Sequence, residues 1–319
     1  MISDLQSEAV RLVRIGIRQS TRATYTSVQS QYKRFCEMYR LCAVPATQVT
    51  LLLYITSLNQ KGIAHSSILV HLAGIRNLHV ELGFGDINVG CPQIKQALKA
   101  IKDMAPPVVK KSPIQLQLLF KLWYQLSHDE YKSMWQALLA LAFYGGLRGA
   151  EYTWTSSCKV GPLLKDLRFV QESGSMIMYF TVAQSKTQAT GMVIPYGCSR
   201  HVVCAVCSMK RYLDIRHARG TVSLQEPLFM YGSKKVTKSM VDSKIKQLVS
   251  LVGLCPEEYS SHSLRAGVAS TAAQAGFKDW EVKRLGGWQS EVYSTYIRDM
   301  AKHRAQFSRR LVKYAQNHV

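Results

Sequence analysis

The 319-residue sequence has few acidic side chains and no long apolar run. Its most apolar stretch, ALLALAFYGGL, is broken by glycines and is shorter than the roughly 18 apolar residues that indicate a membrane span. The N-terminus lacks the uninterrupted apolar middle of a signal peptide, because arginines recur through it. We therefore expect a soluble protein that is neither secreted nor bound to a membrane.

The sequence also lacks a regular cysteine pattern, because its eight cysteines are irregularly spaced. Such spacing does not suggest a disulfide framework, so it favours a reducing compartment. The segment CSRHVVCAVC contains four residues of metal-binding type: Cys198, His201, Cys204 and Cys207. Zinc takes such ligands, but this spacing is tighter than the usual two-knuckle arrangement. The spacing therefore disfavours zinc, and we predict no metal ligands among these residues.

The shortage of acidic residues leaves a strongly basic protein. The sequence contains 20 Asp and Glu residues and 41 Lys and Arg residues, which gives a formal net charge of +21. Residues 1–105 carry twelve basic and six acidic side chains, and residues 106–319 carry 29 and 14. An excess spread over both parts differs from a single basic tail, and it favours a polyanionic partner such as DNA or RNA.

The segment APPVVKKSP divides the chain. Its prolines cannot continue a helix, so we predict a linker at residues 105–113 between domains at 1–104 and 114–319. Helical periodicity dominates before it and predicts a four-helix bundle, with Ser20 or Thr21 as the N-cap of the first helix. After it, residues 166–197 alternate and contain turn signals, which predicts a three-stranded antiparallel sheet among helices. The predicted fold is mainly α with a small sheet.

Several groups suited to phosphate binding follow one another along the second domain. His262 and Arg265 stand three residues apart at the start of an Ala-rich helix, so they share one face. Arg148 lies in FYGGLRGAEY, where glycines end a helix and allow close approach of the backbone. Lys186 lies in AQSKTQATG, at the tip of the predicted hairpin. The pair at 262 and 265 alone would equally fit an ordinary helix surface, and the neighbouring motifs favour a site.

In their order and in their local sequence, these motifs resemble the active-site residues of the tyrosine recombinases, also called phage-integrase-type site-specific recombinases. The matching segments are GGLRGAE, SKT, HSLRAG, LGGW and YIR, which contain Arg148, Lys186, His262, Arg265, Trp288 and Tyr296. The N-terminal TRATYTSVQSQYKRF is similar to the family's helical core-binding domain, so the resemblance covers essentially the whole chain. Residues 259–298 resemble recombinases of eukaryotic mobile elements, the DIRS/Ngaro and Crypton groups.

The chemistry of DNA strand transfer accounts for these residue types. A tyrosine phenoxide at Tyr296 can attack phosphorus and conserve the bond energy as a phosphodiester. The two arginines hold the non-bridging oxygens and bind them more tightly in the transition state. Lys186 can protonate the departing 5′ oxygen, and His262 can take or orient the phenolic proton. Trp288 offers an indole N–H and a packing ring.

Some neighbours leave alternatives open. Tyr293 competes with Tyr296, which matches the family wording but follows Trp288 by eight residues where many relatives have nine. We predict Tyr296 as the nucleophile and Tyr293 as a packing residue. Glu151 is predicted to orient Arg148. Arg284 and Arg298 fit a phosphate contact or a solvated face.

The resemblance implies an enzyme that cleaves and religates double-stranded DNA through a 3′-phosphotyrosine and a Holliday junction. It implies no metal and no other cofactor, and a homotetramer on DNA in which the basic tail after the nucleophile reaches a neighbouring subunit. The compartment would be the nucleus for a eukaryotic element and otherwise the cytoplasm. The alternatives are a DNA-binding relative without activity and a type IB topoisomerase-like enzyme.

Overall fold

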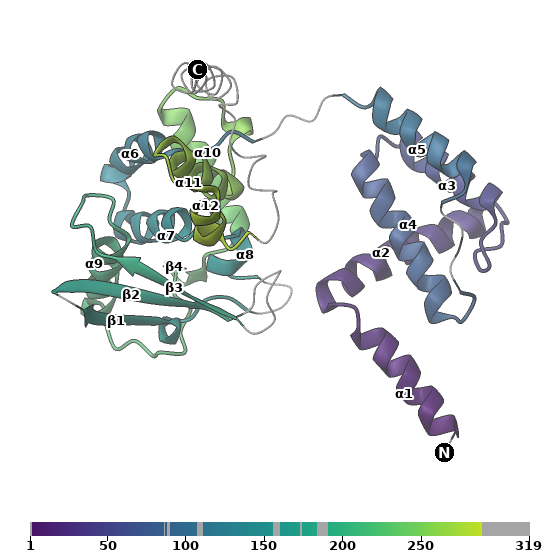
Figure 1. The fold of residues 1–319 in the computed structure, drawn as a ribbon, viewed down its shortest axis with the longest axis horizontal. Helices are drawn as coiled ribbons and strands as arrows, with labels where there is room; N and C mark the ends of the chain where they lie inside the picture. The colour runs from purple at the N-terminus through teal and green to yellow at the C-terminus, as the bar shows by residue number, and fades with distance from the viewer. Residues whose placement is uncertain are drawn as a thin grey trace, which may run out of the picture. The chain divides into compact units, whose positions relative to one another are not determined.

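The computed structural model describes residues 2–85, 87, 90–106, 111–155, 160–172, 174–183 and 191–288. The chain divides into two compact units, residues 1–108 and 109–319. Figure 1 colours the first from purple to blue and the second from teal to yellow. The division falls within the segment 105–113, and the roles assigned to the two domains stay predictions.

Unit 1 is helical (Figure 1). Its helices are α1 (Ile2–Ile15), α2 (Gln19–Met38), α3 (Gln48–Gln60), α4 (His65–Glu81) and α5 (Pro92–Met104). One apolar cluster fills the space between α2, α3, α4 and α5, and it includes Tyr32, Ile55, Ile68, Ile75 and Ile94. Helices α2 and α4 lie close together at Gly74, where an added Cβ would be 2.9 Å from a methyl carbon of Val28. The helical bundle expected from the sequence is present.

Two local features of unit 1 differ from the sequence prediction. Helix α2 begins at Gln19, so neither Ser20 nor Thr21 is its N-cap. Arg18 holds the N-cap position without a side-chain capping bond. Helix α1 was not predicted, and its Leu5 and Leu12 side chains are exposed.

Unit 2 packs helices against a small sheet. Its helices are α6 (Leu116–Gln125), α7 (Lys132–Tyr144), α8 (Gly149–Tyr152), α9 (Ala205–Ala218), α10 (Lys238–Leu251), α11 (Ser261–Gln274) and α12 (Asp279–Gly286), with short 3₁₀ turns at Leu126–His128, Leu164–Asp166 and Pro256–Glu258. Its strands are β1 (Leu167–Glu172), β2 (Ser175–Val182), β3 (Met192–Gly197), β4 (Met230–Tyr231) and β5 (Lys234–Lys235). The short β4–β5 hairpin is an addition to the predicted elements.

The predicted three-stranded sheet is confirmed. It has the order β1-β2-β3 with antiparallel pairing, and β2 pairs with β3 from Ile177 opposite Gly197 to Val182 opposite Met192. Met178, Phe180 and Val182 alternate along β2 and are buried, as the two-residue period of a strand requires. Residues 184–190, which include Lys186, lie between β2 and β3 and outside the described residues.

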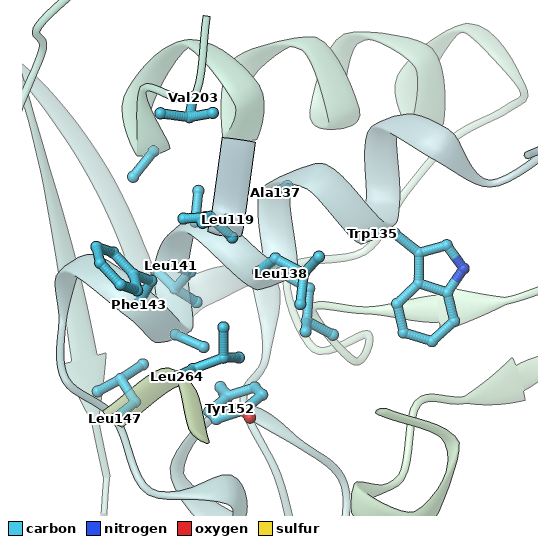
Figure 2. Packing of buried hydrophobic residues seen from close by; sticks show 14 of the residues in the cluster. Leu119, Trp135, Ala137, Leu138, Leu141, Phe143, Leu147, Tyr152, Val203 and Leu264 are labelled. Carbon is cyan, nitrogen blue, oxygen red and sulfur yellow. The ribbon is translucent and has the colours of Figure 1, made fainter. Parts of the chain in front are cut away.

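Helix α7 is the centre of unit 2: in Figure 1 it lies between α6 and α11 on one side and the sheet with α9 on the other. Residues 134–143 are all buried, which is the pattern of a helix enclosed on every side. Figure 2 shows the cluster around it, to which Leu141 of α7, Leu264 of α11 and Tyr152 of α8 all contribute. The enclosed helix fixes the position of the segment that follows it, which carries Arg148.

The start of unit 2 is tied to α11 by backbone hydrogen bonds. The Ser112 N–H donates to the Glu258 carbonyl at 2.6 Å, and the Ile114 N–H donates to the Ser263 carbonyl at 2.8 Å. Gly267 of α11 permits this contact, because an added Cβ would be 1.8 Å from the Ile114 carbonyl oxygen. Within the described residues, no helix is both long and apolar enough to cross a membrane.

Candidate active site

Two glycines at the end of α7 bring other elements close to the chain just before Arg148. An added Cβ on Gly145 would be 2.0 Å from the hydroxyl oxygen of Tyr196, which donates to the Leu141 carbonyl. Gly146 has a φ of +54°, a conformation that favours glycine, and its Cβ would be 3.1 Å from the Cα of Gly286. The glycines therefore permit the close packing that the sequence suggested.

Arg148 is held by Glu151, one turn away. The Arg148 backbone N–H donates to Glu151 Oε2 at 2.8 Å, and its Nη1 donates to Oε1 at 2.9 Å. The carboxylate is almost fully buried, whereas the arginine side chain keeps 26% of its surface exposed. This arrangement fixes the direction of a guanidinium whose side chain is only partly buried. It has the geometry of the predicted orienting contact, although the role itself stays a prediction.

Helix α11 carries the next two predicted residues, and its first turn is anchored by α10. Asp242 of α10 accepts the Ser261 N–H at 2.7 Å and pairs with Lys238 Nζ at 2.6 Å. A carboxylate at this end of a helix also interacts favourably with the helix dipole. His262 and Arg265 follow in the first turns of α11, on one face as predicted.

Arg265 is buried and is fixed by contacts from two segments. Its Nη1 donates to the Gly146 carbonyl, and its guanidinium carbon lies 4.4 Å from the centre of the Trp288 ring. Trp288 is also buried, and it packs so closely on Gly286 that an added Cβ there would be 2.1 Å from the ring. These contacts bring Arg265, Trp288 and the Arg148 segment into one site.

His262 lies among the cations of this site. It keeps part of its surface exposed to solvent. Partial burial, followed by the positive charges of Arg265, Lys238 and Arg148, holds the pKa of His262 below its usual 6.5. The imidazole is therefore neutral at pH 7, and a neutral imidazole can accept a proton or a hydrogen bond.

Lys238 is a site residue that the sequence reasoning missed. Its side-chain carbons lie against Gly149, where an added Cβ would be 3.2 Å from Lys238 Cδ. It therefore stands beside both Arg148 and His262, at the start of α10. The available signal was its position four residues before Asp242 on a predicted helix, which favours an ion pair and thus a fixed ammonium.

The described residues give three fixed cations, Arg148, Arg265 and Lys238, around a neutral histidine. Such a cluster binds a phosphate group through charge-assisted hydrogen bonds. Arg284 lies in the last turn of α12 and is exposed, as expected for a solvated face or a phosphate contact. Lys186, Tyr293, Tyr296 and Arg298 lie outside the described residues, so their assigned roles stay predictions.

Comparison with known proteins finds a relative along most of the chain. The chain is 24% identical over 295 residues to the integrase/recombinase xerD homolog of Selenomonas ruminantium, which covers 90% of this chain and 83% of the relative. No family model matches the sequence.

Solved structures match the fold across both units. The Tn1549 transposon integrase in complex with circular intermediate DNA has a TM-score of 0.61 at 14% identity, covering 95% of this chain and 98% of that one. A lambda integrase dimer bound to a COC′ core site has a TM-score of 0.57 at 18% identity, covering 94% and 95%. The XerH recombinase bound to difH has a TM-score of 0.57 at 14% identity, covering 86% and 75%. The chain therefore shares the fold of these integrases and recombinases and is similar in sequence to the xerD homolog.

Proposed function

We propose that this protein is a tyrosine-type DNA recombinase that cuts and reseals DNA through a covalent 3′-phosphotyrosine on Tyr296. One observation carries the proposal. Arg148, His262, Arg265 and Trp288 are separated by up to 140 positions in the sequence, yet their segments meet in one cationic site. These are the residues whose order and local sequence resemble the active-site residues of the tyrosine recombinases.

The arrangement suits phosphoryl transfer without a reacting water. Two guanidiniums, one buried and one partly open, can hold the two non-bridging oxygens of a phosphodiester. Arg265 is held by Gly146 and Trp288 before any ligand binds, so little reorganisation is needed as charge develops on those oxygens. This preorganisation supports preferential binding of the transition state.

Proton transfer follows from the same groups. The tyrosine must lose its proton to attack phosphorus, and an unperturbed phenol titrates near ~10. Nearby cations lower that value by favouring the phenoxide, and neutral His262 can accept the proton. Lys186 then supplies a proton to the 5′ oxygen that leaves, so that the bond to Tyr296 forms as the bond to the 5′ oxygen breaks.

Double-stranded DNA is the proposed substrate. The net charge of +21 suits a polyanion, and solved structures of similar fold are complexes with a transposon intermediate, a core site and difH. We further propose a mobile-element recombinase that exchanges strands through a Holliday junction. The sequence of residues 259–298 is the basis for proposing a DIRS/Ngaro or Crypton affiliation. A nuclear site of action follows from that affiliation.

A nicked suicide substrate tests the proposal. Cleavage beside the nick releases a short fragment, so the covalent protein–DNA adduct accumulates and its attachment site can be mapped by mass spectrometry. We expect the adduct on Tyr296, its loss in Tyr296→Phe, and its persistence in Tyr293→Phe. An adduct on Tyr293 would overturn the assignment of the nucleophile. DNA binding with no adduct in the unaltered protein would indicate a DNA-binding relative without activity.

A second assay separates strand exchange from simple relaxation. Supercoiled plasmid with one candidate site is relaxed by a topoisomerase-like enzyme, which needs no partner duplex. A recombinase instead joins two duplexes and passes through a four-way junction, which a catalytically slow variant should trap. Relaxation without joined products would contradict the recombinase proposal and favour the topoisomerase-like alternative.

A further inference from the structure

Three cysteines meet where the sheet connects to helix α9. Cys198 follows the last residue of β3, Cys204 is the N-cap of α9, and Cys207 lies in its first turn. The Sγ atoms of Cys198 and Cys207 are 3.4 Å apart, and those of Cys204 and Cys198 are 3.9 Å apart. All three sulfurs lie within 4.8 Å of one another. The cluster uses no residue of the candidate active site.

The spacing of the sulfurs matches that of a metal–thiolate site. Zinc binds thiolate sulfur at about 2.3 Å in a tetrahedron, which places neighbouring sulfurs about 3.8 Å apart. The Cys198–Cys207 and Cys198–Cys204 separations lie on either side of that value, and the third pair lies within 4.8 Å. A disulfide would bring two sulfurs to about 2.05 Å and would leave the third without a role.

The loop between the cysteines explains how so short a segment can form a site. Arg200 has a φ of +54°, a left-handed conformation that reverses the chain after Cys198. The Cys204 N–H then donates to the His201 carbonyl at 2.9 Å, and the Ser199 N–H donates to Cys204 Sγ at 3.4 Å. A donor aimed at sulfur stabilises the thiolate form.

Helix α9 adds a second stabilising influence. Its first N–H groups and its dipole favour negative charge at the N-terminus, where Cys204 and Cys207 lie. Cys204 is buried, whereas Cys198 and Cys207 are half-buried, so an ion has a route of entry. His201 is exposed, lies outside the cluster, and has its ring 5.2 Å from that of Phe120.

We propose that Cys198, Cys204 and Cys207 form a three-thiolate site for a zinc ion. Binding deprotonates the three thiols and releases their protons, and water can complete the tetrahedron. The ion would join the end of β3 to the start of α9, where the Cys198 N–H also donates to the Met176 carbonyl of β2 at 3.0 Å. It would therefore have a structural role at the C-terminal end of β3.

Metal titration of the full chain tests the proposal. The protein is stripped with chelator under reducing conditions, passed through gel filtration, and titrated with Zn²⁺ or with Co²⁺ as a coloured substitute. We expect one ion per chain by elemental analysis, proton release on binding, and the intense visible absorption of tetrahedral cobalt thiolate. Free Zn²⁺ at about 100 times its dissociation constant should raise the melting temperature of unit 2 by about 5–10 °C.

Serine variants assign the ligands. Cys198→Ser, Cys204→Ser and Cys207→Ser should each lose the cobalt thiolate absorption and the melting shift. Cys255→Ser is the matched control, because Cys255 is an exposed cysteine of the same unit. Should buried Cys204→Ser fail to fold, the two half-buried positions still decide the outcome, and their melting temperatures without metal report folding directly.

Two outcomes would overturn the proposal. One is a reduced, folded chain that takes up no zinc. The other is zinc binding that persists in both Cys198→Ser and Cys207→Ser. Neither outcome depends on DNA cleavage, so the metal site and the recombinase proposal succeed or fail separately.

Discussion

The guanidinium of Arg265 lies over the indole ring of Trp288, with 4.4 Å between the guanidinium carbon and the ring centre. The same guanidinium donates to the Gly146 carbonyl, and only 3% of the Arg265 surface is exposed. A cation over an aromatic face is stabilised by the ring quadrupole, more so when both are removed from water. The ring thus fixes the direction of the guanidinium.

Removing the Trp288 ring should reduce both stability and cleavage. Trp288→Ala is expected to lower the free energy of unfolding by about 3–5 kcal/mol, because a large buried side chain is lost. Trp288→Phe keeps a ring face for Arg265 but loses the N–H, so it should retain more of the stability. Urea unfolding and single-turnover cleavage provide the measurements. Trp280→Ala, an exposed tryptophan of α12, is the control, and Trp288→Ala with unchanged stability would contradict the packing argument.

Glu151 should be required to hold Arg148. Glu151→Ala removes both acceptors of Arg148 and is expected to cost about 1.5–3 kcal/mol of stability, the range for hydrogen bonds to charged groups. Glu151→Gln keeps the volume and one acceptor oxygen, so cleavage should fall less than in Glu151→Ala. Exposed Glu130→Ala serves as the control. Equal cleavage by Glu151→Ala and the unaltered protein would show that Arg148 needs no orientation.

Protonation of His262 should slow cleavage at acidic pH, and this decrease should begin only below pH 6.5. Its lowered pKa means that the neutral, proton-accepting form persists to more acidic pH than in an unperturbed histidine. The cleavage rate at low DNA concentration, which reports the free enzyme, should therefore decrease only below pH 6.5. In His262→Gln this decrease at acidic pH should disappear. A decrease in the rate that begins at or above pH 6.5 and disappears in His262→Gln would contradict the prediction.

The same pKa predicts the direction of the stability change. Between the lowered pKa and 6.5, the unfolded chain binds more protons at this residue than the folded chain does. The contribution of His262 to stability is thus fully present above pH 6.5 and is lost as pH falls through the lowered pKa. Unfolding curves measured across this range should show a smaller slope with pH in His262→Gln.

Lys186 is expected to be the general acid, and Lys238 is the competing lysine. Lys186→Ala should slow cleavage by about 100- to 10,000-fold, the usual contribution of a positioned acid. A bridging 5′-phosphorothiolate substrate needs no proton on its leaving sulfur, so it should largely restore the rate of Lys186→Ala. Lys238→Ala should show no such rescue. Rescue of Lys238→Ala in place of Lys186→Ala would transfer the role to the lysine beside Gly149.

The basic tail should be needed for assembly rather than for binding one site. Under the proposed function, exchange between two duplexes takes four cleavages with one nucleophile per subunit, so we expect four subunits on DNA. A cyclic contact through a C-terminal segment can close such a ring. Removing residues 305–319 should preserve single-site binding and abolish the tetramer and strand exchange. Light scattering on DNA measures this, and a tetramer of the shortened protein would show that the tail is dispensable.

The elements that local sequence specifies were predicted well. The β2–β3 hairpin is encoded by alternation and turn residues, and the pair on α11 is encoded by helical spacing. Gly145 and Gly146 indicated that other groups pack closely on the backbone there, but the sequence did not identify those groups. That information depends on tertiary packing, which places Tyr196 and Gly286 there.

Features that depend on distant packing were missed. Lys238 joins the site only because α10 packs beside α11 and α8. The spacing of the cysteines along the chain also did not show that Cys198, Cys204 and Cys207 would bring their sulfurs within 4.8 Å of one another, around a loop in which Arg200 is left-handed. The start of α2 was wrong because capping preference is weak compared with the burial that positions the helix.

The bonds from Ser112 and Ile114 have a mechanical consequence. They connect the chain that enters unit 2 to the residues just before α11 and to the first turn of α11, the helix that also carries His262 and Arg265. Tension applied to the chain at Lys111 would therefore act on α11 before it reached the sheet or α9. We expect hydrogen exchange at the Ile114 amide to slow when DNA is bound. Faster exchange would mean that this connection loosens as the site is occupied.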